Sequence, residues 1–191
     1  MIDIQNERMK FVQLCYCGNR EDVFSGVVDK SYRDFCRVLR GFGSSHKEGK
    51  ERARFFLINS LKQFFNTEHI DFDSWHKDTM YSLIELFDFP KFTLGTSQKW
   101  INMSFKYLYC LYDIQTNLRV TMPLEKFNDC HCPIDNVIIH KLKDYNITLK
   151  SSCTWSQLTD YSDYIHYQKS IRDLAAEKKM SALDLELLLW Q

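Results

Sequence analysis

Two short segments of the chain carry residue types that could work together in nucleophilic chemistry. The first surrounds Gly95 and ends on Lys99, which we expect to open a strongly apolar helix. The second places Asp135 two residues after Pro133, at the expected start of another helix. An uncharged lysine amine is a nucleophile, and a carboxylate can stabilise positive charge or assist deprotonation. Beside a bound phosphate, such a pair could break a bond at a sugar carbon.

The segment before Lys99 suggests how a phosphate would be held. Gly95 permits backbone conformations that other residues avoid, so we expect a tight turn there. A helix that starts just after a turn has free N–H groups, which can bind an anionic oxygen. The candidate nucleic-acid-binding residues are therefore Gly95, Thr96, Ser97 and Gln98.

Lys99 and Asp135 are the candidate catalytic residues. A helix N-terminus and partial burial both favour the uncharged form of an amine, which makes Lys99 a candidate nucleophile. Asp135 is a candidate N-cap, and backbone donors would keep its carboxylate ionised. It would then stabilise a positively charged, oxocarbenium-like carbon or help to deprotonate the attacking amine.

These residues resemble two motifs of the helix–hairpin–helix DNA glycosylase superfamily. Residues 95–99, Gly-Thr-Ser-Gln-Lys, resemble its Gly-x-Gly-x-Lys hairpin, which ends on the Schiff-base lysine. Residues 133–138, Pro-Ile-Asp-Asn-Val-Ile, resemble its later Pro-Val-Asp-x-x-Val segment, which carries an essential aspartate. The nearest types are the small 8-oxoguanine glycosylase/lyases, whose corresponding helix has lysines at both ends, like Lys99 and Lys106 here. The resemblance covers about residues 90–142.

The resemblance implies a DNA N-glycosylase with β-lyase activity that excises an 8-oxoguanine-like purine without a cofactor. Its substrate would be DNA carrying a damaged or modified base, extruded into an aromatic pocket. Candidates for that pocket are Phe42, Trp75, Trp100, His131 and Trp190. The chain departs from the superfamily pattern in having Ser97 at the second hairpin glycine and in placing the aspartate 36 positions after the lysine.

Two other functions stay open on the sequence. One is a non-catalytic helix–hairpin–helix module that binds nucleic acid or a partner, in a defence system for example. The equal numbers of basic and acidic residues, 25 each, favour that alternative because they give no general attraction for polyanions. The other is a zinc site at Cys15 and Cys17 with Cys130 and Cys132. Both pairs are separated by one residue, whereas structural zinc sites favour two to four, so we expect no metal.

The elements that must position these residues are predicted to be helices throughout. Hydrophobic residues make up 45% of the 191-residue chain, and only six glycines and three prolines interrupt it. We expect a single all-α domain over 1–191, a compact orthogonal arrangement of seven to eight helices containing a helix–hairpin–helix motif. Its parts would be N-terminal helices over 1–90, the hairpin with the lysine and aspartate helices over 91–145, and C-terminal helices over 146–191. Apolar periodicity predicts helices at 31–39, from between 47 and 50 to about 65, 73–87, 97–112, 135–145, 160–178 and 181–190.

The remaining expectations concern the longest irregular stretch and the cellular compartment. Residues 115–130 are expected to form a loop over the site or a short strand pair at 119–122. No apolar run approaches the roughly 20 residues of a membrane span, so no membrane partner is expected. Seven cysteines, an odd number, and no signal segment predict a cytoplasmic protein with reduced thiols.

Overall fold

The chain is all-α, as the periodicity predicts. The computed structural model describes residues 4–18, 22–112, 122–149 and 154–191, and these contain helices and no strands. The longer helices are α1 (Ile4–Cys17), α2 (Val23–Phe35), α3 (Lys47–Asn66), α4 (Phe72–Phe87), α5 (Leu94–Tyr112), α7 (Asn136–Leu142), α8 (Tyr161–Glu177) and α9 (Ala182–Leu189). Short 3₁₀ turns are η1 (Cys36–Val38), η2 (Ser44–His46), η3 (Leu124–Phe127), η4 (Lys143–Tyr145) and η5 (Trp155–Gln157).

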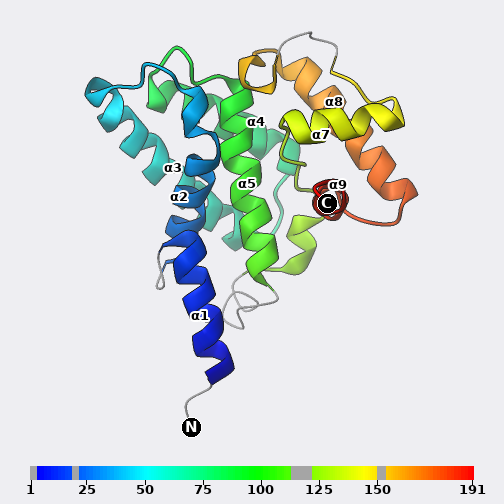
Figure 1. The fold of residues 1–191 in the computed structure, drawn as a ribbon, viewed down its shortest axis with the longest axis horizontal. Helices are drawn as coiled ribbons and strands as arrows, with labels where there is room; N and C mark the ends of the chain where they lie inside the picture. The colour runs from blue at the N-terminus through cyan, green and yellow to red at the C-terminus, as the bar shows by residue number, and fades with distance from the viewer. Residues whose placement is uncertain (1–3, 19–21, 113–121, 150–153) are drawn as a thin grey trace.

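Helix α5 is the central element of the fold. Helices α2 and α3 lie on one side of it, α7, α8 and α9 lie on the other, and α4 crosses behind it, while α1 extends away from the rest (Figure 1). Its apolar residues occur on almost every side, which is typical of a helix surrounded by other elements. Trp100 and Phe105 are fully buried in the core that these helices share. Residues on α5 therefore have fixed surroundings over most of its length.

The start of α5 differs from the sequence prediction. The helix begins at Leu94 instead of near Ser97, and residues 88–93 form the connection from α4. Gly95 lies inside the first helical turn, where its N–H donates to the Leu158 carbonyl at 3.0 Å. A Cβ at this position would lie only 1.8 Å from the carbonyl oxygen of Trp155. Glycine is required there for close approach of two backbones, and the predicted tight turn was wrong.

Helix α4 is capped by a different residue from the one predicted. Asp71, rather than Asp73 or Ser74, is the N-cap, and its carboxylate accepts from the Ser74 N–H. Asp73 lies inside the first turn and is free to bind other side chains. The predicted cap at Asp135 is confirmed, because its side chain accepts from the Ile138 N–H.

The N-terminal helices are where the sequence prediction was least accurate. The helix predicted at 31–39 starts at Val23, ends at Phe35 and continues as η1. Helix α1 was not predicted; Phe11 and Tyr16 on it are more than half exposed, so it lacks a buried apolar stripe. The strand pair predicted at 119–122 lies almost entirely outside the described residues. Within the described ranges, no helix has both the length and the apolar character needed to cross a membrane.

Candidate functional site

The fold brings together the two residues predicted to be catalytic. The Nζ of Lys99, on the second turn of α5, lies 2.9 Å from Oδ2 of Asp135, the N-cap of α7. The other carboxylate oxygen, Oδ1, accepts from the Ile138 N–H at 3.0 Å. The side chain of Lys99 is 5% exposed and that of Asp135 is 15% exposed. One oxygen of Asp135 therefore fixes the carboxylate to the helix while the other holds the amine.

Lys99 and Asp135 open onto a cavity of about 450 Å³, which we call the lysine cavity. This volume is within the range of small-molecule sites. Its apolar part comes from Met103 and aromatic side chains, and its charged part includes three basic residues of α2 and η1. The lining residues used below are Tyr16, Lys30, Arg33, Arg37, Met103, Tyr107, Trp155 and Trp190.

Hydrogen bonds hold one wall of the lysine cavity in place. The Tyr107 hydroxyl donates to Asp34 at 2.5 Å, and Lys30 pairs with the same carboxylate at 2.5 Å. Burial, and then the hydrogen bond to Asp34, raises the pKa of Tyr107, so its hydroxyl stays protonated. In the described part of the chain, Arg33 and Arg37 have no acidic ion-pair partner. These two guanidinium groups are available to an anionic ligand.

A second, larger hollow lies beside the lysine cavity and shares Arg37 with it. This hollow, which we call the basic groove, has a volume of about 870 Å³. Arg37, Arg40 and Lys91 give it three cations, and none of its lining residues within the described ranges is acidic. Its remaining polar lining consists of Thr93, Thr154, Ser156 and Gln157. A local excess of positive charge is therefore present on a chain whose formal net charge is zero.

The residues predicted to hold a phosphate have other partners. Thr96, Ser97 and Gln98 are fully buried. The Ser97 hydroxyl donates to the Met80 carbonyl at 3.1 Å, and the Ser97 N–H donates to the Thr93 carbonyl at 2.9 Å. The N–H of Gly95 is bound to Leu158, as described above. Hydrogen bonds within the protein therefore use these polar groups at the start of α5. The prediction of a phosphate site at Gly95–Gln98 was wrong.

Gln98 instead positions the segment that carries Asp135. Its side-chain amide donates to the Ile134 carbonyl at 2.9 Å, and its carbonyl accepts from the Ile134 N–H at 3.2 Å. Gln168 makes the same pair of bonds to Cys132, at 2.8 and 3.1 Å. The two glutamine side chains make the kind of hydrogen bonds to this segment's backbone that a neighbouring strand would make. They hold its backbone against α5 and α8, which fixes the position of Asp135.

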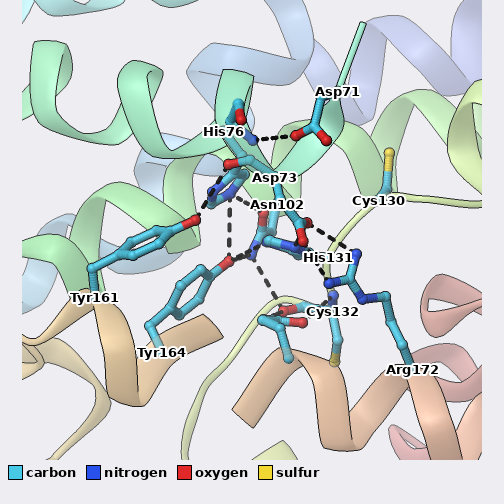
Figure 2. Close-up of polar contacts among 12 residues, drawn as sticks. Asp71, Asp73, His76, Asn102, Cys130, His131, Cys132, Tyr161, Tyr164 and Arg172 are labelled. Carbon is cyan, nitrogen blue, oxygen red and sulfur yellow. Dashed lines mark hydrogen bonds and ion pairs between the residues drawn. The ribbon is translucent and has the colours of Figure 1, made fainter. Parts of the chain in front are cut away.

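A buried polar network supports the other end of the same segment (Figure 2). His131 contacts the Tyr164 hydroxyl through Nδ1 and Asp73 through Nε2, both at 2.8 Å. Asp73 also forms a two-pronged ion pair with Arg172 at 2.8 and 2.9 Å. Asn102 donates to Tyr164 at 3.1 Å and so links the network to α5. His131, a candidate for a base pocket, is a structural residue here.

The electrostatics of the network follow from its burial. Burial lowers the pKa of His131 and lowers that of His76 further. The hydrogen bond from His131, and then the one from Arg172, holds the pKa of Asp73 below its usual range. His76 Nε2 contacts Asn102 at 2.8 Å, whereas its Nδ1 has no hydrogen-bond partner in the part of the chain that the structure describes. The two imidazoles are therefore neutral in the folded protein near pH 7.

Lys106 forms a second lysine–carboxylate pair on α5. Its Nζ donates to Oε1 of Glu186 at 2.9 Å and lies 2.6 Å from Oε2, which receives no well-oriented hydrogen bond. Glu186 is fully buried, and Lys106 is 9% exposed. The same ammonium lies 5.2 Å from the ring centre of Trp190. Lys106 is therefore a lysine at the edge of a cavity.

The predicted aromatic residues separate into core and cavity. Trp100 is buried and donates to the Val28 carbonyl at 2.9 Å, and Phe42 and Trp75 pack against other rings of the core. Trp190 alone of the five candidates lines the lysine cavity. Sequence reasoning missed three of its aromatic residues, Tyr16, Tyr107 and Trp155. The spacing of Lys99, Met103 and Tyr107, four residues apart each time, could have indicated that Tyr107 shares their face.

Comparisons with family models, with curated proteins and with solved structures found no match to this chain. The chemistry of the site is therefore inferred from its own residues. Among the residues that the structure describes, no three His, Cys, Asp or Glu side chains gather as a metal site.

Proposed function

We propose that the protein is a DNA N-glycosylase with β-lyase activity, with Lys99 as nucleophile and Asp135 as its partner. The observation that supports this most is the 2.9 Å contact between a nearly buried amine and a carboxylate at the wall of a 450 Å³ cavity. A lysine amine that has lost its proton is a nucleophile, and a carboxylate within hydrogen-bond distance can take up that proton. The substrate is DNA that carries a damaged or modified purine.

The proposed reaction begins with transfer of a proton from the Lys99 ammonium to Asp135. The free amine attacks C1′ of the extruded nucleotide, and the glycosidic bond breaks with its electron pair leaving on the base, which takes up the proton held by Asp135 and leaves that residue as a carboxylate. Opening of the sugar ring then gives an imine between Nζ and C1′. Removal of a proton from C2′ expels the 3′ phosphate by β-elimination, and water releases the lysine.

The position of Asp135 suits this sequence. Ile138 fixes one carboxylate oxygen by its N–H, so the other oxygen faces the amine without searching other rotamers. Once the base leaves, a carboxylate beside C1′ stabilises the positive charge that develops there. Asp135 can therefore act as both base and electrostatic partner in one place.

The surroundings of the lysine cavity favour a nucleotide as the ligand. Aromatic rings line the cavity, and an extruded base stacks on such rings. The basic groove continues from it at Arg37 and offers two further cations, Arg40 and Lys91, to phosphates of the strand. In this proposal, the groove replaces the predicted Gly95 turn as the phosphate-binding surface.

Borohydride trapping tests the proposal. The protein is incubated with duplex DNA that contains an abasic site or 8-oxoguanine, and borohydride reduces any imine to a stable adduct. The expected result is an adduct with the unmodified chain and none with Lys99→Gln. The matched control is Lys169→Gln, which removes an exposed lysine on α8 and keeps the adduct. No adduct with either DNA would overturn the proposal.

The second candidate function is a non-catalytic module that binds nucleic acid. The observation that favours it is the balanced charge of the chain, 25 basic against 25 acidic residues. Gel-shift assays with the same DNA separate the two functions. A module would bind equally well with Lys99→Gln and form no adduct, whereas an enzyme forms the adduct.

A further inference from the structure

Helix α1 carries an unusually large share of the exposed apolar side chains. Twelve large apolar side chains are exposed in the described part of the chain, and five of them lie on this one helix of 14 residues. These five are Ile4, Phe11, Val12, Leu14 and Tyr16. Two more, Leu188 and Trp190, lie at the end of α9. Apolar side chains that are exposed singly are ordinary, whereas a cluster of them marks a binding surface.

The exposed apolar residues of α1 follow the length of the helix. Ile4 and Phe11 are seven residues apart and Leu14 follows Phe11 by three, so these side chains form a stripe along one side. Val12 and Tyr16 lie beside that stripe, and both line a separate hollow of about 380 Å³, which we call the apolar hollow. Its wall comes from α1, α5 and the end of α9, where Trp190 contributes to it. The five residues of α1 therefore continue into Leu188 and Trp190, and we call these seven together the α1 surface.

The α1 surface has about the area of one half of a dimer interface. Its seven residues are between 37% and 63% exposed. At about 200 Å² for a large side chain, an exposure of about one half leaves about 700 Å² uncovered. The largest apolar patch on an ordinary monomer is about 300–600 Å², and a stable interface takes about 800 Å² from each partner. The α1 surface is therefore large for a monomer and close to what a second copy of the chain needs.

The position of α1 suits a partner that is a copy of this chain. The helix extends away from the other helices, so a second helix can lie along it (Figure 1). A two-fold dimer brings the same patch of both subunits together, and an apolar stripe along a helix can pack against itself in this way. Charge does not oppose the contact, because the formal net charge of the chain is zero and Lys10 of α1 pairs with Glu7 at 2.8 Å.

A lipid surface matches α1 less well than a second copy does. Helices that lie on membranes are rich in lysine and arginine, which attract anionic lipids. Helix α1 has two such residues, Arg8 and Lys10, and the ion pair with Glu7 offsets the charge of the second. The apolar stripe therefore lacks the flanking basic residues that would direct it to a membrane.

We propose that the protein forms a two-fold dimer in which α1 packs antiparallel against α1 of a second copy. Full overlap of two helices that each span Ile4–Cys17 puts the two-fold axis at their midpoint, next to Phe11. The two Phe11 side chains then meet at the axis, and each α1 also lies over the apolar hollow of the other copy. Dimer formation is independent of the reaction proposed above, because it needs neither Lys99 nor Asp135.

The mass in solution tests the dimer. Size-exclusion chromatography with light scattering is run from about 1 to about 100 μM protein, which spans the dissociation constants of weak standard-size interfaces. We expect twice the mass of one chain. Phe11→Glu puts a charge at the centre of the contact and should weaken dimerisation at least tenfold. The matched control is Phe55→Glu on α3, where the phenylalanine is 66% exposed against 63% for Phe11, and this variant should stay dimeric. Circular dichroism checks that both variants are folded.

A mixture of two charged variants tests whether the two Phe11 side chains meet. Phe11→Glu and Phe11→Lys should each be monomeric, because like charges would face each other at the two-fold axis. Mixed in equal amounts, the two variants should form a heterodimer through opposite charges at the same place. Added salt should weaken this heterodimer, since it screens the attraction between exposed charges.

Several results would overturn the dimer. One is a chain that stays monomeric up to about 100 μM, where even a weak standard-size interface would form. A dimer that survives Phe11→Glu, or that Phe55→Glu disrupts equally, would have its interface elsewhere. A variant mixture that stays monomeric would show that the two α1 helices do not meet at Phe11. A monomer that sediments with phosphatidylcholine–phosphatidylserine vesicles, and loses this binding with Phe11→Glu, would make α1 a membrane-binding helix instead.

Discussion

The two lysine–carboxylate pairs on α5 have the same composition but different exposure. In the first, Lys99 meets a carboxylate at a helix N-terminus, and the Asp135 side chain is 15% exposed at the lysine cavity. In the second, Lys106 meets Glu186, which is fully enclosed. Burial raises the pKa of the Glu186 carboxyl, and Lys106 beside it lowers the pKa by less. A lysine–carboxylate pair that exchanges protons with a ligand must reach the cavity, as Lys99 and Asp135 do. The enclosed Lys106–Glu186 pair suits a role in which the carboxylate only orients the ammonium.

The electrostatic environments of the pairs are also linked. The pKa of Glu186 responds to Lys106 first and then to the charges of Lys99 and Asp135. A change of protonation at the first pair is therefore felt at the second. If Lys99 passes its proton to Asp135, as proposed, a positive and a negative charge near Glu186 disappear together, and their opposite effects on the pKa of Glu186 are both lost.

The largest expected effect on stability comes from breaking the enclosed pair. Lys106→Met leaves the Glu186 carboxylate buried without its partner, and we expect a loss of about 3–5 kcal/mol of unfolding free energy. Replacing both residues by Met should cost far less, since no lone charge stays behind. Urea denaturation of the single and double variants measures the difference. Equal losses in both would contradict the view that the pair is enclosed.

A smaller effect on stability, but a larger one on chemistry, is expected at the first pair. Asp135→Asn keeps an N-cap on α7, because asparagine caps helices about as well as aspartate. Water in the lysine cavity can hydrate the ammonium of Lys99, so the expected cost is about 1–2 kcal/mol. Adduct formation on abasic DNA should nevertheless fall at least tenfold.

Thermal unfolding and borohydride trapping are measured on the same preparation of Asp135→Asn. Lys99→Gln serves as the reference for complete loss of the adduct. If Asp135→Asn traps as well as the unmodified chain, the carboxylate only caps the helix.

The first pair was predicted and the second was not. Capping by Asp135 depends on adjacent residues and the helix around Lys99 follows from apolar periodicity, whereas the pairing itself was expected from the resemblance of the two segments to glycosylase motifs. Glu186 is 80 residues from Lys106, and no local pattern connects them. The same limit explains Gly95, whose neighbour Trp155 comes from a distant segment, and Gln98, which bonds a backbone 36 residues away. Apolar periodicity correctly predicted that the elements are helices. Contacts between distant segments determine which polar groups stay free to bind a ligand, and periodicity does not show those contacts.

The smallest expected effect is on how the free energy of unfolding changes with pH. Here the enclosed pair and the network of His76, His131 and Asp73 act in opposite directions. The two imidazoles have lowered pKa values in the folded chain, so the unfolded chain binds more protons below about pH 6.5 and stability falls as the pH is lowered. Asp73 acts in the same direction at lower pH, because its pKa is lowered in the folded state.

Glu186 acts in the opposite direction. Its pKa is raised on folding, so the folded chain binds more protons just above the ordinary value of 4.5, and stability rises there as the pH is lowered.

The double change of Lys106 and Glu186 to Met removes this opposing contribution. The expected result is a steeper loss of stability between pH 6 and pH 4 than in the unmodified chain, measured by urea denaturation at each pH. His76→Asn should make the loss shallower, since one neutral imidazole no longer gains a proton on unfolding. Parallel pH profiles for all three chains would show that neither the network nor the enclosed pair changes its protonation on folding.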